Sequence, residues 1–110
     1  MKTLKTIAWE IWNKKYLGEE FSHIYKKNTY HIRIKISYSF INSDIKKILL
    51  NEIEYSINNE SKTEFYNWFG TPTKCLRGLS SEDSLYQRLK NDIEKIIKNK
   101  RKHWVYKDYL

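Results

Sequence analysis

The chain has 110 residues, of which 40% are hydrophobic, 15% aromatic and 31% charged. This length predicts one domain over residues 1–110, and the composition excludes a disordered chain because it holds enough apolar side chains for a core. The apolar runs are too short to cross a bilayer, and no secretory signal follows the charged start. We therefore expect a cytoplasmic protein without a membrane segment.

The net charge is +8 at pH 7, and seventeen of the twenty-one cationic side chains are lysines. Fourteen isoleucines, nine asparagines and nine tyrosines accompany them. All four residue types are encoded by AT-rich codons, so codon usage is an alternative source of the positive charge. This usage fits an AT-rich organism or a mobile gene cassette of bacterial or phage origin.

The first predicted element is an amphipathic helix over residues 3–17. Its apolar side chains recur at intervals of three and four residues and form one stripe: Leu4, Ile7, Ala8, Ile11 and Trp12. Trp9 lies off this stripe. Gly18 is the expected stop, because glycine readily adopts the left-handed conformation that ends many helices.

A β-hairpin over residues 20–40 is predicted next. Apolar residues alternate with polar ones from Tyr30 to Phe40, and the polar positions are Arg33, Lys35, Ser37 and Ser39. One face of this strand should therefore enter a core while the other meets water. Residues 19–27 fit a helical stripe or a strand. We favour a strand because of the clear strand that follows, to which Lys27-Asn28-Thr29 could provide the turn from 20–26.

Two helices are predicted in the middle of the chain. Residues 44–58 carry a helical stripe after the capping residues Asn42-Ser43-Asp44. A second capping pattern at Ser61-Lys62-Thr63-Glu64 predicts a short helix that ends at Gly70. Residues 71–80 should form a loop, since they include the only proline.

The last predicted helix begins after Ser80 or Ser81, and its stripe consists of Leu85, Leu89, Ile93, Ile96 and Ile97. The tail over 103–110 alternates weakly and is a candidate strand. Together these elements predict an α+β domain, in which a small antiparallel sheet packs against four helices on one face. The other face would carry Arg33 and Lys35.

Sequence motifs for catalysis, metals and cofactors are missing. The residues His23, His31, Cys75 and His103 lack the spacing of a known metal site, and the three glycines are too far apart for a phosphate loop. Cys75 is alone, so no internal disulfide is expected and the thiol should be packed or half-buried. We expect no enzyme, no cofactor and no metal. A small RNase toxin remains an alternative, with His31, Arg33, Lys35 and Tyr38 as its candidate residues.

The C-terminal segment favours a binding role. Five cations fall within ten residues that contain no acid, and two aromatic residues lie among them: Lys98, Lys100, Arg101, Lys102, Lys107, Trp104 and Tyr106. Phosphate contacts with base stacking are typical of single-strand binding, so a nucleic-acid-binding accessory protein is one hypothesis. Cations at the end of a helix also stabilise its dipole, which provides a purely structural explanation.

The main hypothesis is a protein-binding inhibitor of the immunity, antitoxin or anti-defence type. Seventeen aromatic residues exceed the needs of a small core, and tyrosine and tryptophan concentrate binding energy at interfaces. The tyrosines expected to be partly exposed are Tyr16, Tyr30, Tyr55, Tyr66, Tyr86, Tyr106 and Tyr109. A basic surface would attract an acidic toxin or nuclease. The candidate contact residues are the C-terminal set, Tyr109, Arg33 and Lys35, and the chain should be a monomer or a homodimer.

Overall fold

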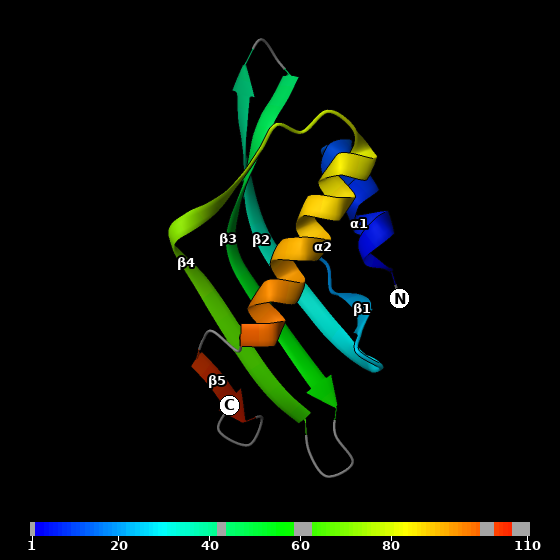
Figure 1. Cartoon of the computed structure of the whole chain (residues 1–110), viewed down its shortest axis with the longest axis vertical. Helices are drawn as coiled ribbons and strands as arrows, with labels where there is room; N and C mark the ends of the chain where they lie inside the picture. Colours follow the sequence, from blue (N-terminus) through cyan, green and yellow to red (C-terminus); the bar gives the residue numbers. More distant parts are fainter. Residues whose placement is uncertain (1, 42–43, 59–62, 100–102, 107–110) are drawn as a thin grey trace.

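The computed structural model describes residues 2–41, 44–58, 63–99 and 103–106. It confirms the α+β class, with two helices and five strands among these residues (Figure 1). The strands form one antiparallel sheet in the order β1-β2-β3-β4-β5, so each strand pairs with its neighbour in sequence. The elements are α1 (Leu4–Trp12), β1 (Phe21–Tyr25), β2 (Asn28–Ile41), β3 (Asp44–Asn58), β4 (Thr63–Arg77), α2 (Glu82–Asn99) and β5 (His103–Tyr106).

Helix α1 is shorter than the sequence predicts, because it ends at Trp12 and not at residue 17. The Asn13 side chain donates a hydrogen bond to the Trp9 carbonyl at 2.8 Å, and Lys14 turns into the left-handed region with φ 59°. The segment released from the helix brings the Tyr16 hydroxyl to the main-chain N–H and C=O of Ile34, at 3.4 and 3.3 Å. Tyr16 thus caps the outer edge of β2 beyond the end of β1.

The predicted hairpin of β1 and β2 is confirmed, but its turn lies earlier. Lys26 and Lys27 both have positive φ, as in a two-residue type I′ turn, and Asn28 already pairs with Tyr25. Near the start of β2, buried apolar residues alternate with exposed polar residues, as the sequence predicts. Ile32 and Ile34 are buried, whereas Arg33 and Lys35 are exposed.

The helix predicted over residues 44–58 is wrong, because this segment is strand β3. The register with β4 is interrupted at Asn51, between Leu50 and Glu52. The buried residues of β3 are therefore even-numbered before this irregularity and odd-numbered after it: Ile48, Leu50, Ile53 and Tyr55. The predicted helical stripe consists of Ile45, Ile48, Leu49, Ile53 and Ile57. In the strand, the successive residues Ile48 and Leu49 point to opposite faces, and the irregularity at Asn51 brings Ile53 to the same face as Ile48.

The predicted helix that ends at Gly70 and the loop over residues 71–80 are also wrong, because residues 63–77 form β4. Leu50 pairs with Lys74 and Glu52 with Phe69, so Asn51 alone stands opposite residues 70–73. This bulge spans residues 70–73 and contains Gly70 and Pro72. In Figure 1, β4 bows away from α2 at its bend and then returns to the sheet.

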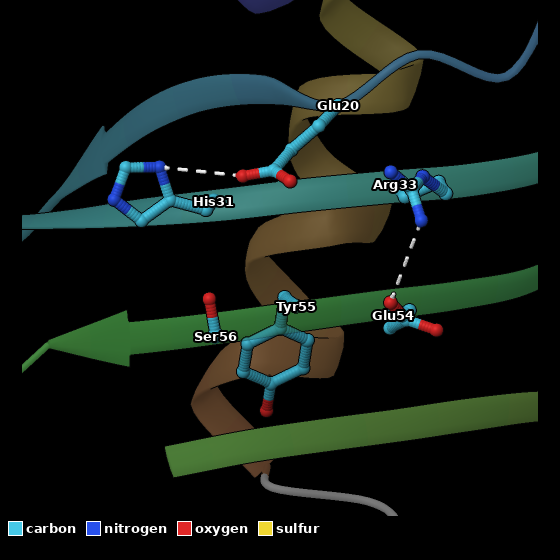
Figure 2. A pocket seen from close by; sticks show the side chains of 6 residues that line it. All are labelled: Glu20, His31, Arg33, Glu54, Tyr55 and Ser56. Carbon is cyan, nitrogen blue, oxygen red and sulfur yellow. Dashed lines mark ion pairs between the residues drawn. The ribbon is translucent and has the colours of Figure 1, made fainter. Parts of the chain in front are cut away.

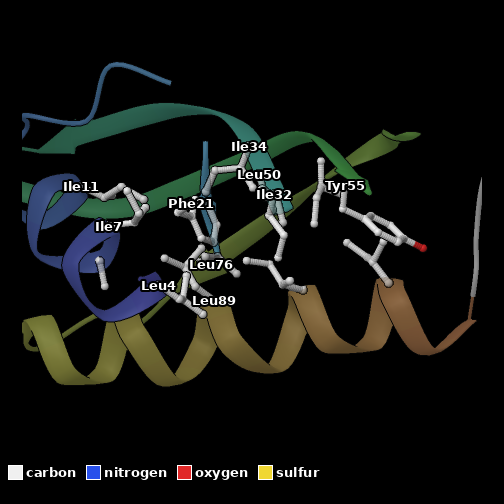
Figure 3. Packing of buried hydrophobic residues seen from close by; sticks show 14 of the residues in the cluster. Leu4, Ile7, Ile11, Phe21, Ile32, Ile34, Leu50, Tyr55, Leu76 and Leu89 are labelled. Carbon is white, nitrogen blue, oxygen red and sulfur yellow. The ribbon is translucent and has the colours of Figure 1, made fainter. Parts of the chain in front are cut away.

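Helix α2 confirms the last predicted helix. It begins after Ser81, whose Oγ accepts a hydrogen bond from the Ser84 N–H at 3.1 Å. Both helices lie on one face of the sheet, which we call the covered face, and the opposite one is the open face (Figure 3). The core between helices and sheet includes Leu4, Ile7, Ile11, Phe21, Ile32, Ile34, Leu50, Tyr55, Leu76 and Leu89.

Strand β5 confirms part of the C-terminal strand, and it pairs with residues 64–67 of β4. The rest of that prediction, residues 107–110, lies outside the described residues. Within the described part of the chain, neither helix has the length and apolar character that a membrane crossing needs. The four predicted helices are reduced to two, and the sheet is correspondingly larger.

Candidate functional site

The two predicted binding residues of β2 lie on the open face, where acidic residues of β3 accompany them. The Arg33 guanidinium is 4.0 Å from the Glu54 carboxylate, and both side chains are about half exposed. Lys35 stands opposite Glu52 in the register of β2 with β3. The open face therefore carries mixed charge here. The cations of β2 do not form a uniformly basic strip.

A shallow polar pocket lies on the open face, and five of its six lining side chains are polar (Figure 2). The His31 Nδ1 atom is 3.7 Å from the Glu20 carboxylate, which precedes β1. Arg33, Glu54 and Ser56 from β2 and β3 complete this polar set. An imidazole and a carboxylate can serve as proton donor and proton acceptor in cleavage of a phosphodiester, and a guanidinium can stabilise the charge on the phosphoryl oxygens.

The sequence identified only part of this pocket. His31 and Arg33 were candidates because they share one face of a clear strand. Glu54 and Ser56 were missed because their segment resembled a helix, and Glu20 was missed because it precedes the strand that brings it close. The cross-strand register Arg33–Glu54 and His31–Ser56 could have been found only by recognising β3.

The two histidines of the hairpin do not form a site together. His23 pairs in register with Tyr30, and His31 pairs with Ser22, so the two imidazoles lie on opposite faces of the sheet. No group of three His, Cys, Asp or Glu side chains suited to a metal ion occurs among the described residues. The Cys75 thiol is half-buried, as expected, and lies 3.4 Å from Nε of Arg77.

The predicted C-terminal contact residues are only partly visible. Lys98 is exposed in the last turn of α2. Trp104 and Tyr106 belong to β5, at the opposite edge of the sheet from β1. Two strands separate β5 from β2, which places the strands about 14 Å apart, so Arg33 and Lys35 do not join a surface on β5. The remaining predicted residues, Lys100, Arg101, Lys102, Lys107 and Tyr109, lie outside the described residues.

Two of the tyrosines predicted to be partly exposed are buried. Tyr30 and Tyr55 are buried in the core and contact each other edge to face, with ring centroids 5.8 Å apart. Tyr16 and Tyr86 are half-buried and so fit the prediction. Burial raises the pKa of Tyr16 to about 12. Tyr109 and the side chains of Tyr66 and Tyr106 lie outside the described part of the structure.

The exposed large apolar side chains of the described residues all fall between positions 9 and 24. They are Trp9 on α1, Leu17 in the segment after α1, and Ile24 on β1, with exposed fractions of 45%, 86% and 70%. Four exposed lysines flank them in sequence: Lys14, Lys15, Lys26 and Lys27. We call these seven residues the N-terminal edge.

Lysine side chains lie over two aromatic rings of this region, the exposed Trp9 and the half-buried Tyr25. The Lys15 ammonium lies 5.1 Å from the ring centroid of Trp9, and that of Lys26 lies 5.4 Å from the ring of Tyr25. Both distances fall within the range of a cation–π contact. The N-terminal edge thus combines apolar side chains with positive charge, although the sequence pointed mainly to the other end of the chain.

Comparison with protein-family models, with curated proteins and with solved structures gives no match for this chain.

Proposed function

We propose that this protein is a non-enzymatic inhibitor that binds one partner protein through the N-terminal edge and blocks it by occlusion. The observation that supports this most is the confinement of the exposed large apolar side chains to Trp9, Leu17 and Ile24. Trp9 lies on a helix of the covered face, and Ile24 alternates with His23 and therefore points to the open face. The three side chains thus expose apolar surface on both sides of the region formed by α1 and β1, and a partner that grips this region would displace water from them. Their flanking lysines suit the polar rim of an interface.

The charge of this edge indicates the kind of partner. Four lysines flank the three apolar side chains, and the acids Glu19 and Glu20 lie in the same stretch. An acidic protein surface, such as that of a toxin or nuclease, would be attracted to this edge, and its association would be faster at low salt. Trp9 is the residue type that most often carries binding energy at such interfaces.

The test is capture of the partner from an extract of the natural host, with and without nuclease treatment of the extract, and with the protein on a support. The partner is expected to be one protein that stays bound at moderate salt, because buried apolar contacts are weakly screened. The variants Trp9→Ala and Ile24→Ser should release it, and both side chains are exposed enough to leave folding intact. The matched control is Lys98→Ala on α2, which should retain the partner.

Two outcomes would contradict the proposal. If the captured material disappears with nuclease, the protein is a nucleic-acid-binding accessory protein, whose affinity should fall steeply with salt. If Lys98→Ala releases the partner while Trp9→Ala and Ile24→Ser do not, the binding surface is the C-terminal segment.

A second candidate function, RNA cleavage, is favoured by the polar pocket of Figure 2. Glu54 would take the proton of the ribose 2′-hydroxyl as its oxygen attacks phosphorus. The bond to the 5′-oxygen would break as protonated His31 donates a proton to it, and Arg33 would stabilise the charge on the phosphoryl oxygens. The products would be a cyclic 2′,3′-phosphate and a free 5′-hydroxyl.

RNA cleavage has a direct test that is independent of partner capture. A labelled single-stranded RNA should yield cyclic-phosphate ends, and His31→Gln should abolish the cleavage while His23→Gln, on the other face, retains it. Expression should also arrest growth. Unhindered growth together with intact RNA would exclude this candidate.

A further inference from the structure

A groove lies between β4 and α2, beside the bulge in β4. Residues 70–73 stand opposite Asn51 alone, and the strand bows away from the helix at this point (Figure 1). Trp68 lies shortly before the bulge and Lys74 follows it, and both residues line the groove on the β4 side. Bulges recur next to binding sites because they re-aim side chains and end regular packing.

The groove has an apolar wall and a charged rim. It encloses about 620 Å³ including the solvent at its mouth, and residues of β4 and α2 line it: Trp68, Lys74, Asp92, Lys95, Ile96 and Asn99. Ile96 is buried in the core cluster, and Trp68 is half-buried and packs against that cluster. Small-molecule sites typically combine such an apolar wall with a few polar groups.

The charges of the groove are unequal. Asp92 is 8% exposed, and its carboxylate forms an ion pair with the Lys74 ammonium at 3.2 Å. Lys95 lies one turn further along α2 and is exposed. With one acid and two lysines, the groove has an excess of one positive charge, and Asn99 adds an amide that can donate hydrogen bonds.

We propose that this groove is a binding site for a small planar organic anion, such as an aromatic carboxylate or sulfonate. The flat apolar part of the ligand would lie against Trp68 and Ile96, where burial of apolar surface favours binding. Its anionic group would meet the Lys95 ammonium at the rim. The negative charge of Asp92 offsets the positive charge of Lys74 in their ion pair. Asp92 therefore limits the affinity of the groove for an anion.

Binding can be measured by calorimetry with three small probes. Naphthoate is planar and anionic, naphthamide has the same shape without the charge, and cyclohexanecarboxylate has the charge without the flat ring. We expect naphthoate to bind more tightly than either of the other two. No naphthoate binding up to its solubility limit, or equal affinity for naphthoate and naphthamide, would overturn the proposal.

Two substitutions should change naphthoate affinity in opposite directions. Lys95→Gln removes the rim cation and should weaken naphthoate binding about threefold to tenfold. Asp92→Asn keeps the side-chain shape but frees the Lys74 charge, so it should strengthen naphthoate binding about threefold. The matched control Lys98→Gln changes an exposed lysine of the same helix outside the groove, and it should leave the affinity unchanged.

The neutral probe separates ligand recognition from effects on folding. Naphthamide affinity and the unfolding temperature should stay the same in Lys95→Gln, because this side chain is exposed. If Lys95→Gln and Lys98→Gln weaken naphthoate binding equally, the probe senses only overall charge and the proposed site is wrong. If Asp92→Asn weakens naphthoate binding while naphthamide binding is kept, the assigned role of Asp92 is wrong as well.

Discussion

Two histidine–glutamate pairs, one on each face of the sheet, differ in their distance and in their exposure to solvent. On the covered face, Nε2 of His23 lies 2.6 Å from the Glu94 carboxylate of α2, and the two side chains are 10% and 22% exposed. On the open face, His31 and Glu20 are 3.7 Å apart and 27% and 42% exposed. The first pair joins β1 to a helix, whereas the second lines a shallow pocket that solvent reaches. Interactions on the covered face should therefore determine stability, and those on the open face should leave it nearly unchanged.

The largest difference should come from apolar side chains. Leu89 of α2 is fully buried against the sheet, and Leu89→Ala should cost about 2 to 5 kcal/mol of unfolding free energy through lost contacts and a cavity. Lys35→Ala on the open face should cost less than about 0.5 kcal/mol. Urea unfolding of both variants measures the contrast, and similar midpoints would contradict it.

The histidine pairs themselves should give the next largest contrast. Glu94→Ala removes a hydrogen bond to a charged group in a largely buried place and should destabilise the protein by about 1.5 kcal/mol. Glu20→Ala should change stability by less than about 0.5 kcal/mol, because an exposed pair is screened by water. Equal losses in thermal unfolding would show that the two faces are energetically alike.

Tyr16 provides a prediction at the edge between the two faces. Tyr16→Phe should cost about 1 kcal/mol, since the hydroxyl hydrogen bonds to Ile34 are lost. Burial raises the pKa of Tyr16 from 10.0 to about 12 in the folded protein. Its ionisation therefore favours the unfolded state, and stability should fall as pH rises from about 10 to 12.

The Phe variant at position 16 should lose less stability over this alkaline interval than the original protein does. Unfolding midpoints measured at pH 8 and pH 11 give both values. An equal alkaline loss in the two proteins would mean that other groups dominate and that Tyr16 ionises as it does in water.

The smallest effect is expected for the Arg33–Glu54 pair on the open face. A double-mutant cycle with Arg33→Ala and Glu54→Ala should give a coupling of about 0.2 to 0.5 kcal/mol, because both side chains are about half exposed. The coupling should shrink further in high salt. A value above about 1.5 kcal/mol would show that the open face is far more rigid than its exposure indicates.

The fold was predictable where the backbone is regular and was mispredicted where bulges interrupt it. The strict alternation of β2 and the long stripe of α2 identify these elements from sequence alone. In β3, the irregularity at Asn51 changes the parity of the buried positions, so Ile48 and Ile53 share a face although they are five residues apart. Together with Leu49 on the other face, they imitate helical spacing. In β4, Gly70 and Pro72 are signals for a helix end and a loop, yet they form a bulge within a strand.

The candidate sites were predictable only in part, for the same physical reason. Exposure of Trp9 follows from its place off the helical stripe, and the side chain is indeed exposed. Glu20 and Glu54 reach the pocket because their segments lie beside β2 in the sheet. This neighbourhood cannot be predicted when residues 44–58 are assigned to a helix. The groove beside Trp68 depends on the distance between the bulged strand β4 and α2. No local sequence pattern encodes the distance between two elements.

The central claim, a protein interface at the N-terminal edge, is tested most directly by site-specific crosslinking in the natural host. A photoreactive residue is placed at position 24, and the controls carry it at positions 35 and 98. We predict that one protein is crosslinked from position 24 and from neither control, and that it is the protein retained in the capture experiment. Crosslinks from position 98 or 35 with none from position 24 would contradict the account.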